Sequence, residues 1–326
     1  MRSVLVGSQK GGVGKTSLVA ALGALAARPQ PGRRVLLIDG DQQSNLSKRN
    51  FGMPGDGGRD LYSTIVLGEP LQPIRDVRPG LDVVSGGPAL AMVAGAAANA
   101  AAAGLDMASH LHTALDQVNS LGEYALALID LGPGDVALLD AVLAAVDYVV
   151  APHREDEADL DGVELLIKRI LRARRDTNPT LTFLGTVAFA RDPRATARNA
   201  SLDAAVRELL RGSGVEPFIA AIRYSPAVAR DARALALTPQ ELIAEAEKAT
   251  SARISMLRRR RARGQQTEPG RRLGPPLDDE NTLWARPEAS DALARDYLNV
   301  LGELLERIAV AEQVNATATA TGASAG

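Results

Sequence analysis

The chain has 326 residues, of which 46% are apolar, so it can build a full core in one large α/β domain with extensions or in two small domains. Its formal net charge of −2 gives no overall attraction to nucleic acid, so any such contact must come from a local basic surface. The absence of cysteine excludes a disulfide scaffold, a thiolate metal site and a cysteine nucleophile.

A glycine-rich loop lies close to the N-terminus. The apolar run at 4–6 predicts a buried strand and residues 18–27 predict a helix. The stretch between them reads Lys10, Gly11, Gly12, Val13, Gly14, Lys15, Thr16, Ser17. A strand, a glycine-rich loop with Lys-Thr and a helix form a phosphate-binding loop, in which backbone N–H groups and the positive helix end face the anion. We expect residues 10–17 to bind a nucleotide, with Lys15 reaching the β and γ phosphates and Thr16 ligating Mg²⁺.

Lys10 is additional to the basic phosphate-loop pattern. With it, the stretch resembles the "deviant" loop of the ParA/MinD class of ATPases. The resemblance implies a P-loop NTPase fold of the α/β class, with a doubly wound, mainly parallel sheet flanked by helices. It also implies ATP and Mg²⁺ as cofactors, and a homodimer when ATP is bound, in which Lys10 reaches the partner's nucleotide. The resemblance covers roughly residues 1–240 and the last helix.

Carboxylates follow the next apolar strand, which is predicted over 33–39. Asp39 ends this strand and Asp41 lies two residues further on, at the carboxyl edge where open α/β sheets bind ligands. The stretch is similar to the ParA Asp-x-Asp-Pro-Gln-x-Asn motif, with Gln42 in place of the proline. By that resemblance Asp41 positions the attacking water and acts in catalysis with Lys10 and Lys15, while Asp39 supports the metal shell. Solvated turn aspartates are the alternative.

Strands and helices then alternate along the chain. We predict a helix at 61–66, a strand at 81–84, helices at 89–103 and 107–119, and a strand at 124–130 that ends in Asp130. This is where a phosphate-loop ATPase keeps its second acidic motif, so Asp130 is expected to hold Mg²⁺ through water. The family usually reads Asp-x-Pro-Pro here; Pro133 matches and Gly132 departs. How Gln42 and Gly132 affect hydrolysis stays open.

The second half continues the same alternation. We predict strands at 147–152, 181–190 and 217–222 and helices at 163–175 and 200–211, which argues for one doubly wound sheet. His153 is interpreted as a surface loop residue. The exit of the last strand, with Arg223 and Tyr224, lies where the family packs the adenine ring.

Arginines gather in two regions that, in the family, line a sequence-independent DNA surface formed in the ATP dimer. They are Arg191, Arg194, Arg198, Arg223, Arg230 and Arg233. Guanidinium groups suit phosphate contacts, which carry affinity without sequence readout. A solvated charge face is the alternative.

The domain organisation predicted is an ATPase domain at 1–250, a basic Gly/Pro-rich inserted loop at 251–285, a closing helix within 286–312, and a disordered tail at 313–326. The inserted loop carries Arg258–Arg261, Arg263, Arg271 and Arg272. Attraction to a phosphate backbone and a solvated linker are equally compatible with that composition.

Three functions fit these motifs. The first is a ParA-type partition ATPase whose ATP dimer binds DNA non-specifically and is released by a ParB-like partner. The second is a MinD-like regulator or a positioning ATPase for another cargo; a MinD-like protein needs a C-terminal amphipathic helix that the tail does not suggest. The third is an amide-transfer or related metabolic enzyme on the same fold. We expect no signal peptide ahead of the first strand and no membrane partner, and hence a cytoplasmic protein. The resemblance to ParA implies that it is associated with the nucleoid.

Overall fold

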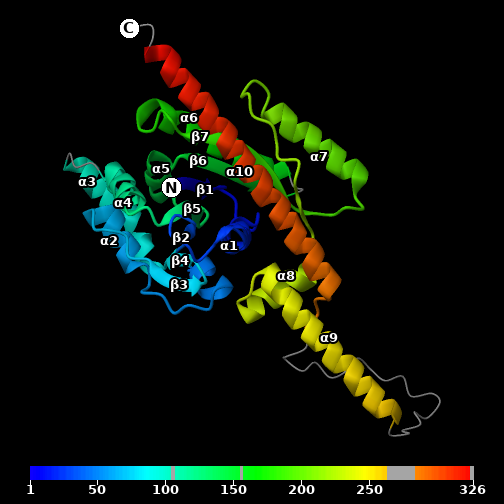
Figure 1. Cartoon of the computed structure of the whole chain (residues 1–326). Helices are drawn as coiled ribbons and strands as arrows, with labels where there is room; N and C mark the ends of the chain where they lie inside the picture. Colours follow the sequence, from blue (N-terminus) through cyan, green and yellow to red (C-terminus); the bar gives the residue numbers. More distant parts are fainter. Residues whose placement is uncertain (104–106, 155–156, 263–282, 324–326) are drawn as a thin grey trace.

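The computed structural model describes residues 1–103, 107–154, 157–262 and 283–323. In this part of the chain, eight strands form one sheet in the order β3-β4-β2-β5-β1-β6-β7-β8 (Figure 1). The strands are β1 Arg2–Val6, β2 Arg34–Gly40, β3 Ile74–Arg78, β4 Leu81–Val84, β5 Tyr124–Leu131, β6 Tyr148–His153, β7 Thr182–Arg191 and β8 Ile222–Arg223. Among them β3 and β4 pair antiparallel, and the other neighbours pair parallel. The predicted doubly wound, mainly parallel sheet is confirmed.

Helices cover both faces of the sheet. They are α1 Lys15–Ala26, η1 Asn45–Asn50, α2 Arg59–Leu67, η2 Pro88–Met92, α3 Val93–Ala102, α4 Ala108–Ser120, α5 Val136–Ala145, α6 Glu157–Asp176, α7 Thr196–Leu209, α8 Pro226–Leu235, α9 Pro239–Ala262 and α10 Pro287–Ala323. Because side chains alternate across a strand, Val4 and Val6 join a core with α1, α8 and α10, whereas Leu5 joins a core with α2 to α6.

The strand register brings the predicted carboxylates together. β5 lies between β1 and β2, and Asp130 pairs in register with Val6 on one side and with Asp39 on the other. The carboxyl ends of these central strands therefore finish at one edge, directly before the glycine-rich loop and the Asp39–Asp41 turn.

The last predicted strand is shorter than expected. Residues 217–222 were predicted to be extended, but β8 comprises Ile222–Arg223. The Glu303 carboxylate of α10 accepts hydrogen bonds from the amides of Ile219 and Ala220 at 3.0 and 2.9 Å, so these amides are not available to a sheet ladder. The antiparallel edge strand β3 was not predicted.

Two helices extend into segments that were predicted to be a loop and a disordered tail, and the first of them, α9, was not predicted. α9 continues to Ala262, although the inserted loop was expected from residue 251, and α10 continues to Ala323, through most of the expected disordered tail. Residues 313–321 contain no proline or glycine and several alanines, which allows the helix to continue. Residues 263–282 of the predicted loop lie outside the described part of the chain. Figure 1 shows α9 leading away from the sheet.

His153 was predicted to be a surface loop residue, and this prediction is wrong. It is the last residue of β6, pairs in register with Ala188 of β7 and is 2% exposed. Burial lowers the pKa of its imidazole. Within the described residues, no helix has the length and apolar character needed to cross a membrane.

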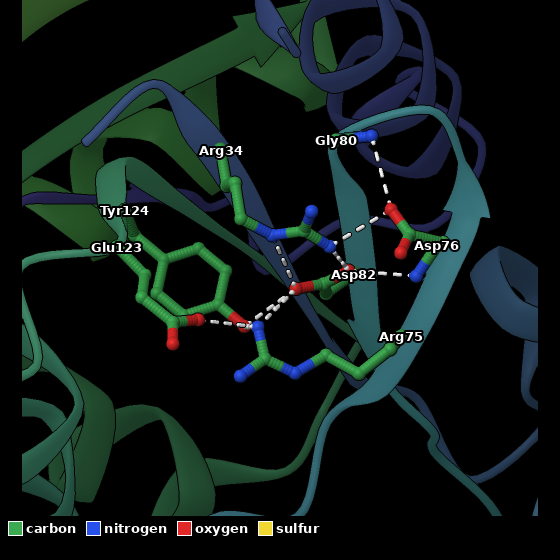
Figure 2. Close-up of polar contacts among 7 residues, drawn as sticks. All are labelled: Arg34, Arg75, Asp76, Gly80, Asp82, Glu123 and Tyr124. Carbon is green, nitrogen blue, oxygen red and sulfur yellow. Dashed lines mark hydrogen bonds and ion pairs between the residues drawn. The ribbon is translucent and has the colours of Figure 1, made fainter. Parts of the chain in front are cut away.

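An ion network centred on the buried Asp82 joins the edge strand β3 to the amino ends of β2 and β5 (Figure 2). The fully buried Asp82 carboxylate of β4 accepts hydrogen bonds from the side chains of Arg34, Arg75 and Tyr124, and from the amide of Asp76 at 2.8 Å. Burial alone would raise the pKa of Asp82. The hydrogen bonds that its carboxylate accepts from Arg34, Tyr124, the Asp76 amide and Arg75 outweigh burial, so the pKa of Asp82 is lowered. The network therefore stabilises the ionised carboxylate.

This balance predicts a pH-dependent stability. A depressed folded-state pKa contributes stability above the unfolded value of about 4, and that stability is lost as the pH falls through the folded value. We expect Asp82→Asn to lower the free energy of unfolding by about 3–5 kcal/mol at pH 7, because arginines are left without their counter-charge. Urea unfolding measures this at pH 7 and at pH 3. The difference in free energy of unfolding between wild type and Asp82→Asn should be smaller at pH 3.

Asp76→Asn is the matched control for this prediction. The Asp76 side chain is 62% exposed and pairs with the same Arg34 at 3.0 Å, so its loss should cost less than about 1 kcal/mol. An equal loss for both variants, or a loss for Asp82→Asn that does not change with pH, would contradict the role of this network.

Candidate nucleotide-binding site

The glycine-rich loop has the backbone geometry of an anion cradle. Gly12 and Gly14 have φ values of 80° and 94°, which L-residues with side chains rarely adopt. Gly14 is the N-cap of α1, and in the described structure no side chain caps the first turn of this helix. Its first N–H groups and its positive dipole end are therefore available to an anion such as a phosphate.

Lys15 is placed inside this cradle. The residue is 6% exposed, and its Nζ donates a hydrogen bond to the carbonyl oxygen of Lys10 at 2.8 Å. Burial lowers the pKa of Lys15, while the charges of Asp130 and Asp41 act in the opposite direction. The structure thus brings together Lys15, Asp130 and Asp41, whose roles toward a nucleotide stay predictions.

Lys10 takes a different position. Its Nζ lies 3.7 Å from a carboxylate oxygen of Asp159 on α6, and its side chain is 38% exposed. A Cβ on Gly162 would lie 3.4 Å from the Cβ of Lys10, so the glycine lets α6 approach the loop closely. The sequence analysis did not predict that Asp159 contacts Lys10. The feature that could have indicated it is the stretch from Asp159 to Gly162, which resembles a segment of the family.

Asp130 is the most unusual group of the site. It is fully buried, and among the described residues neither carboxylate oxygen has a hydrogen-bond partner. Burial, followed by the neighbouring charge of Asp39, raises the pKa of Asp130 to about 8, while the Thr16 hydroxyl and Lys15 oppose this. A buried carboxylate without donors beside a threonine hydroxyl fits a hydrated Mg²⁺ ion, which prefers oxygen ligands.

Asp39 has a different set of contacts. Its carboxylate accepts hydrogen bonds from the amide and hydroxyl of Ser47 at 2.8 and 2.7 Å and from the amide of Asp41 at 3.1 Å. Burial raises its pKa despite these bonds. Asp39 therefore holds the turn over residues 41–47, and its support of a metal shell stays a prediction. In the described residues no group of three or more His, Asp or Glu side chains could hold a metal by itself, so phosphate oxygens and water would have to complete the shell.

Hydrogen bonds hold the Asp41 carboxylate in one orientation. The residue is 6% exposed, and its carboxylate accepts bonds from the amide of Gln43 at 2.9 Å and from the side chain of Asn45 at 2.5 Å. A Cβ on Gly132 would lie 2.9 Å from Asp41 Oδ1. The glycine that departs from the family pattern thus leaves the room that the Asp41 carboxylate occupies.

The loop after β5 also reaches the phosphate loop. Pro133 Cγ lies 3.7 Å from the place of a Cβ on Gly11. Gln42 donates a long hydrogen bond of 3.4 Å to Asp135, whose carboxylate caps α5 by accepting from the Leu138 amide at 3.0 Å. The segment 132–135 therefore contacts both the phosphate loop and the Asp41 turn.

The predicted DNA-binding arginines differ in their contacts. Arg191 and Arg223 each form a bidentate ion pair, with Asp203 of α7 and with Asp296 of α10 respectively. Arg230 stacks at 3.7 Å on the Trp284 ring, and Arg233 donates to the carbonyl of Ala229 at 3.0 Å. Arg194 and Arg198 are exposed, as is Tyr224, which was predicted near the adenine.

Comparisons with known proteins identify the family. A family model described as an AAA domain matches residues 1–183. The chromosome partitioning protein ParA of Caulobacter vibrioides is 34% identical over 200 residues, which are 60% of this chain and 71% of that protein. The chain belongs to the ParA family.

Solved structures support the same fold for this ParA-family chain. Apo McdA from Cyanothece has a TM-score of 0.62 at 20% identity, covering 74% of this chain and 93% of McdA, which shows a common fold. Cobyrinic acid a,c-diamide synthase from Mycobacterium smegmatis, solved with bound ADP and magnesium, has a TM-score of 0.53 at 28% identity, covering 64% of this chain and 82% of that chain. The chain thus has the fold of the P-loop NTPases.

The contact between Gly132 and Asp41 gives a testable prediction. A methyl group in Gly132→Ala would meet Asp41 Oδ1 at 2.9 Å, so the carboxylate must move. We expect nucleotide turnover to fall by about 10²-fold, the scale of a misplaced catalytic group, while nucleotide affinity changes little. Phosphate-release kinetics and equilibrium binding measure the two separately.

Gly134→Ala is a control from the same loop, because nothing lies within 4 Å of a Cβ there, although its φ of 87° adds backbone strain. If Gly132→Ala hydrolyses nucleotide at the wild-type rate, the Asp41 carboxylate does not need the position seen here.

Proposed function

We propose that this chain is a partition ATPase of the ParA type, which binds ATP with Mg²⁺ and uses its hydrolysis to control attachment to DNA. The observation that carries the proposal is the gathering of Lys15, Asp41 and the unpartnered Asp130 at an uncapped helix N-terminus. This is a site with donors for phosphates and an oxygen ligand for a cation.

Each residue has a role in this proposal. Residues 11–17 surround the phosphates, Lys15 offsets the charge on the β and γ phosphates, and Thr16 and Asp130 hold Mg²⁺, with Asp39 supporting the turn beside it. Bound Mg²⁺ supplies charge neutralisation at the phosphates. Asp41 accepts a hydrogen bond from the attacking water and orients it in line with the γ phosphate. Arg223 and Tyr224 lie against the adenine.

The proposed active form is a homodimer that closes on ATP. Lys10 is half-exposed and its ion pair with Asp159 is long at 3.7 Å, so the ammonium can exchange this contact for the nucleotide of a second subunit. The dimer would present the six arginines of residues 191–198 and 223–233 to DNA phosphates without sequence preference, and a ParB-like partner would stimulate hydrolysis and release. We accordingly place the protein in the cytoplasm, associated with the nucleoid.

Two substitutions separate binding from turnover. Lys15→Ala should abolish detectable ATP binding, because it removes the buried ammonium that faces the phosphates. Asp41→Ala should keep ATP binding and DNA association but lower turnover by about 10²-fold or more, because the water loses its acceptor. Fluorescence anisotropy of a labelled ATP and phosphate release report the two steps. Normal hydrolysis by Asp41→Ala would refute the role assigned to that carboxylate.

DNA attachment can be tested through its salt dependence. DNA retardation should require ATP and fail with ADP, and Arg194→Ala should reduce the slope of log affinity against log salt by about one, the value for one lost phosphate contact. Arg211→Ala is the control, since Arg211 is exposed but lies beyond the end of α7 in an ion pair with Glu208. Co-sedimentation with liposomes instead of DNA would favour a MinD-like regulator.

A further inference from the structure

Phe189 connects the phosphate loop to the end of β7. An ideal Cβ on Gly14 would lie 2.5 Å from three carbons of the Phe189 ring. The ring therefore covers the Cα of the glycine that caps α1 and follows Val13 in the nucleotide loop. A change in the path of the loop at Gly14 must move this ring or open a gap beneath it, because packed interiors hold few voids.

The residue after Phe189 marks a bulge in the sheet. Phe189 pairs with Ile222 and Arg191 pairs with Arg223, so Ala190 is an extra residue on β7. Ala190 has a φ of 58°, a left-handed conformation that costs an alanine energy and that glycine adopts freely. Bulges of this kind redirect neighbouring side chains and occur often beside active sites.

Two of the arginines assigned to the DNA surface lie next to this bulge: Arg191 follows it on β7, and Arg223 pairs with Arg191 from β8. Arg191 is held by Asp203 of α7, and its carbonyl accepts the amide of Tyr224 at 2.9 Å. Arg223 is held by Asp296 of α10 through its side chain and through its amide at 3.0 Å. A shift of the bulge therefore reaches Arg191 and Arg223 with their paired carboxylates through covalent and hydrogen-bonded contacts.

We propose that Phe189 is a positioning residue that transmits nucleotide occupancy of the phosphate loop, through the left-handed bulge at Ala190, to the ion pairs of Arg191 and Arg223. The inference rests on the proposed function, because only there are Arg191 and Arg223 assigned to DNA binding. It differs from a switch made by dimerisation alone, because the path lies within one subunit and operates in the monomer.

The experiment compares Phe189→Leu with Phe183→Leu. Both phenylalanines lie on β7 and are partly buried, but Phe183 lies at the opposite end of the strand and packs on the other core. Hydrogen exchange of residues 190–204 and 221–225 is measured without and with a non-hydrolysable ATP analogue and Mg²⁺, at a concentration where light scattering shows a monomer.

In wild type and in Phe183→Leu, the analogue should change the exchange of both segments. In Phe189→Leu this change should shrink by at least about threefold, while the affinity for the analogue stays within about threefold of wild type. An undiminished change in Phe189→Leu would overturn the proposal, and so would a wild-type protein whose exchange responds only once it dimerises.

Ala190→Gly provides a second variant that does not depend on the phenylalanine. Glycine keeps the φ of 58° without strain, so the fold is retained while the bulge becomes free to change its conformation. We expect the exchange response of residues 190–204 to weaken by at least about twofold in this variant, and an unchanged response would also count against the proposal.

DNA retardation separates this inference from the proposed function. A wild-type protein that binds no DNA in the presence of ATP defeats the DNA-partition function, whereas the exchange response still tests the path from Gly14 to Arg191. A wild-type protein that binds DNA with ATP, and a Phe189→Leu variant that does so equally well, defeat the inference alone.

Discussion

The structure depends on the register that sets Asp39 beside Asp130 at the carboxyl edge of the sheet. Both residues are fully buried, and burial raises the pKa of both. Asp39 is satisfied by Ser47 and the Asp41 amide, whereas Asp130 has no hydrogen-bond donor among the described residues, and the Lys15 ammonium only partly offsets the charge. Ionisation of Asp130 is therefore costly without a cation, and a bound Mg²⁺ would offset that cost.

At the amino ends of β2 and β5, a buried carboxylate of the neighbouring strand β4 is fully hydrogen-bonded. There the Asp82 carboxylate is equally buried but receives bonds from Arg34, Arg75, Tyr124 and the Asp76 amide. A satisfied buried network stabilises and specifies the pairing of strands, while an unsatisfied carboxylate is expected where binding occurs. The two ends of the sheet thus divide stability and function between them.

The parts predicted from sequence are those that short-range patterns determine. The phosphate loop, the carboxylates after two apolar strands and the alternation of strands with helices depend on neighbouring residues. The partners of Lys10, Arg191 and Arg223 do not: Asp296 lies 73 positions from Arg223, and the Phe189 ring over Gly14 comes from a strand that follows six others in the chain. The length of α10 was underestimated because an alanine-rich polar segment suits both a tail and a helix.

The ion pairs bear on how a DNA surface could be switched. A guanidinium that donates two hydrogen bonds to one carboxylate offers a phosphate fewer donors and little net charge, so on the proposed DNA surface Arg191 and Arg223 would attract phosphate weakly in the state described here. On that proposed surface the exposed Arg194 would attract phosphate already in the state described here. In the proposed function, release of the Arg191 and Arg223 ion pairs would raise the affinity for DNA, and both arginines lie next to the bulge at Ala190, which follows the Phe189 ring packed on Gly14 of the phosphate loop.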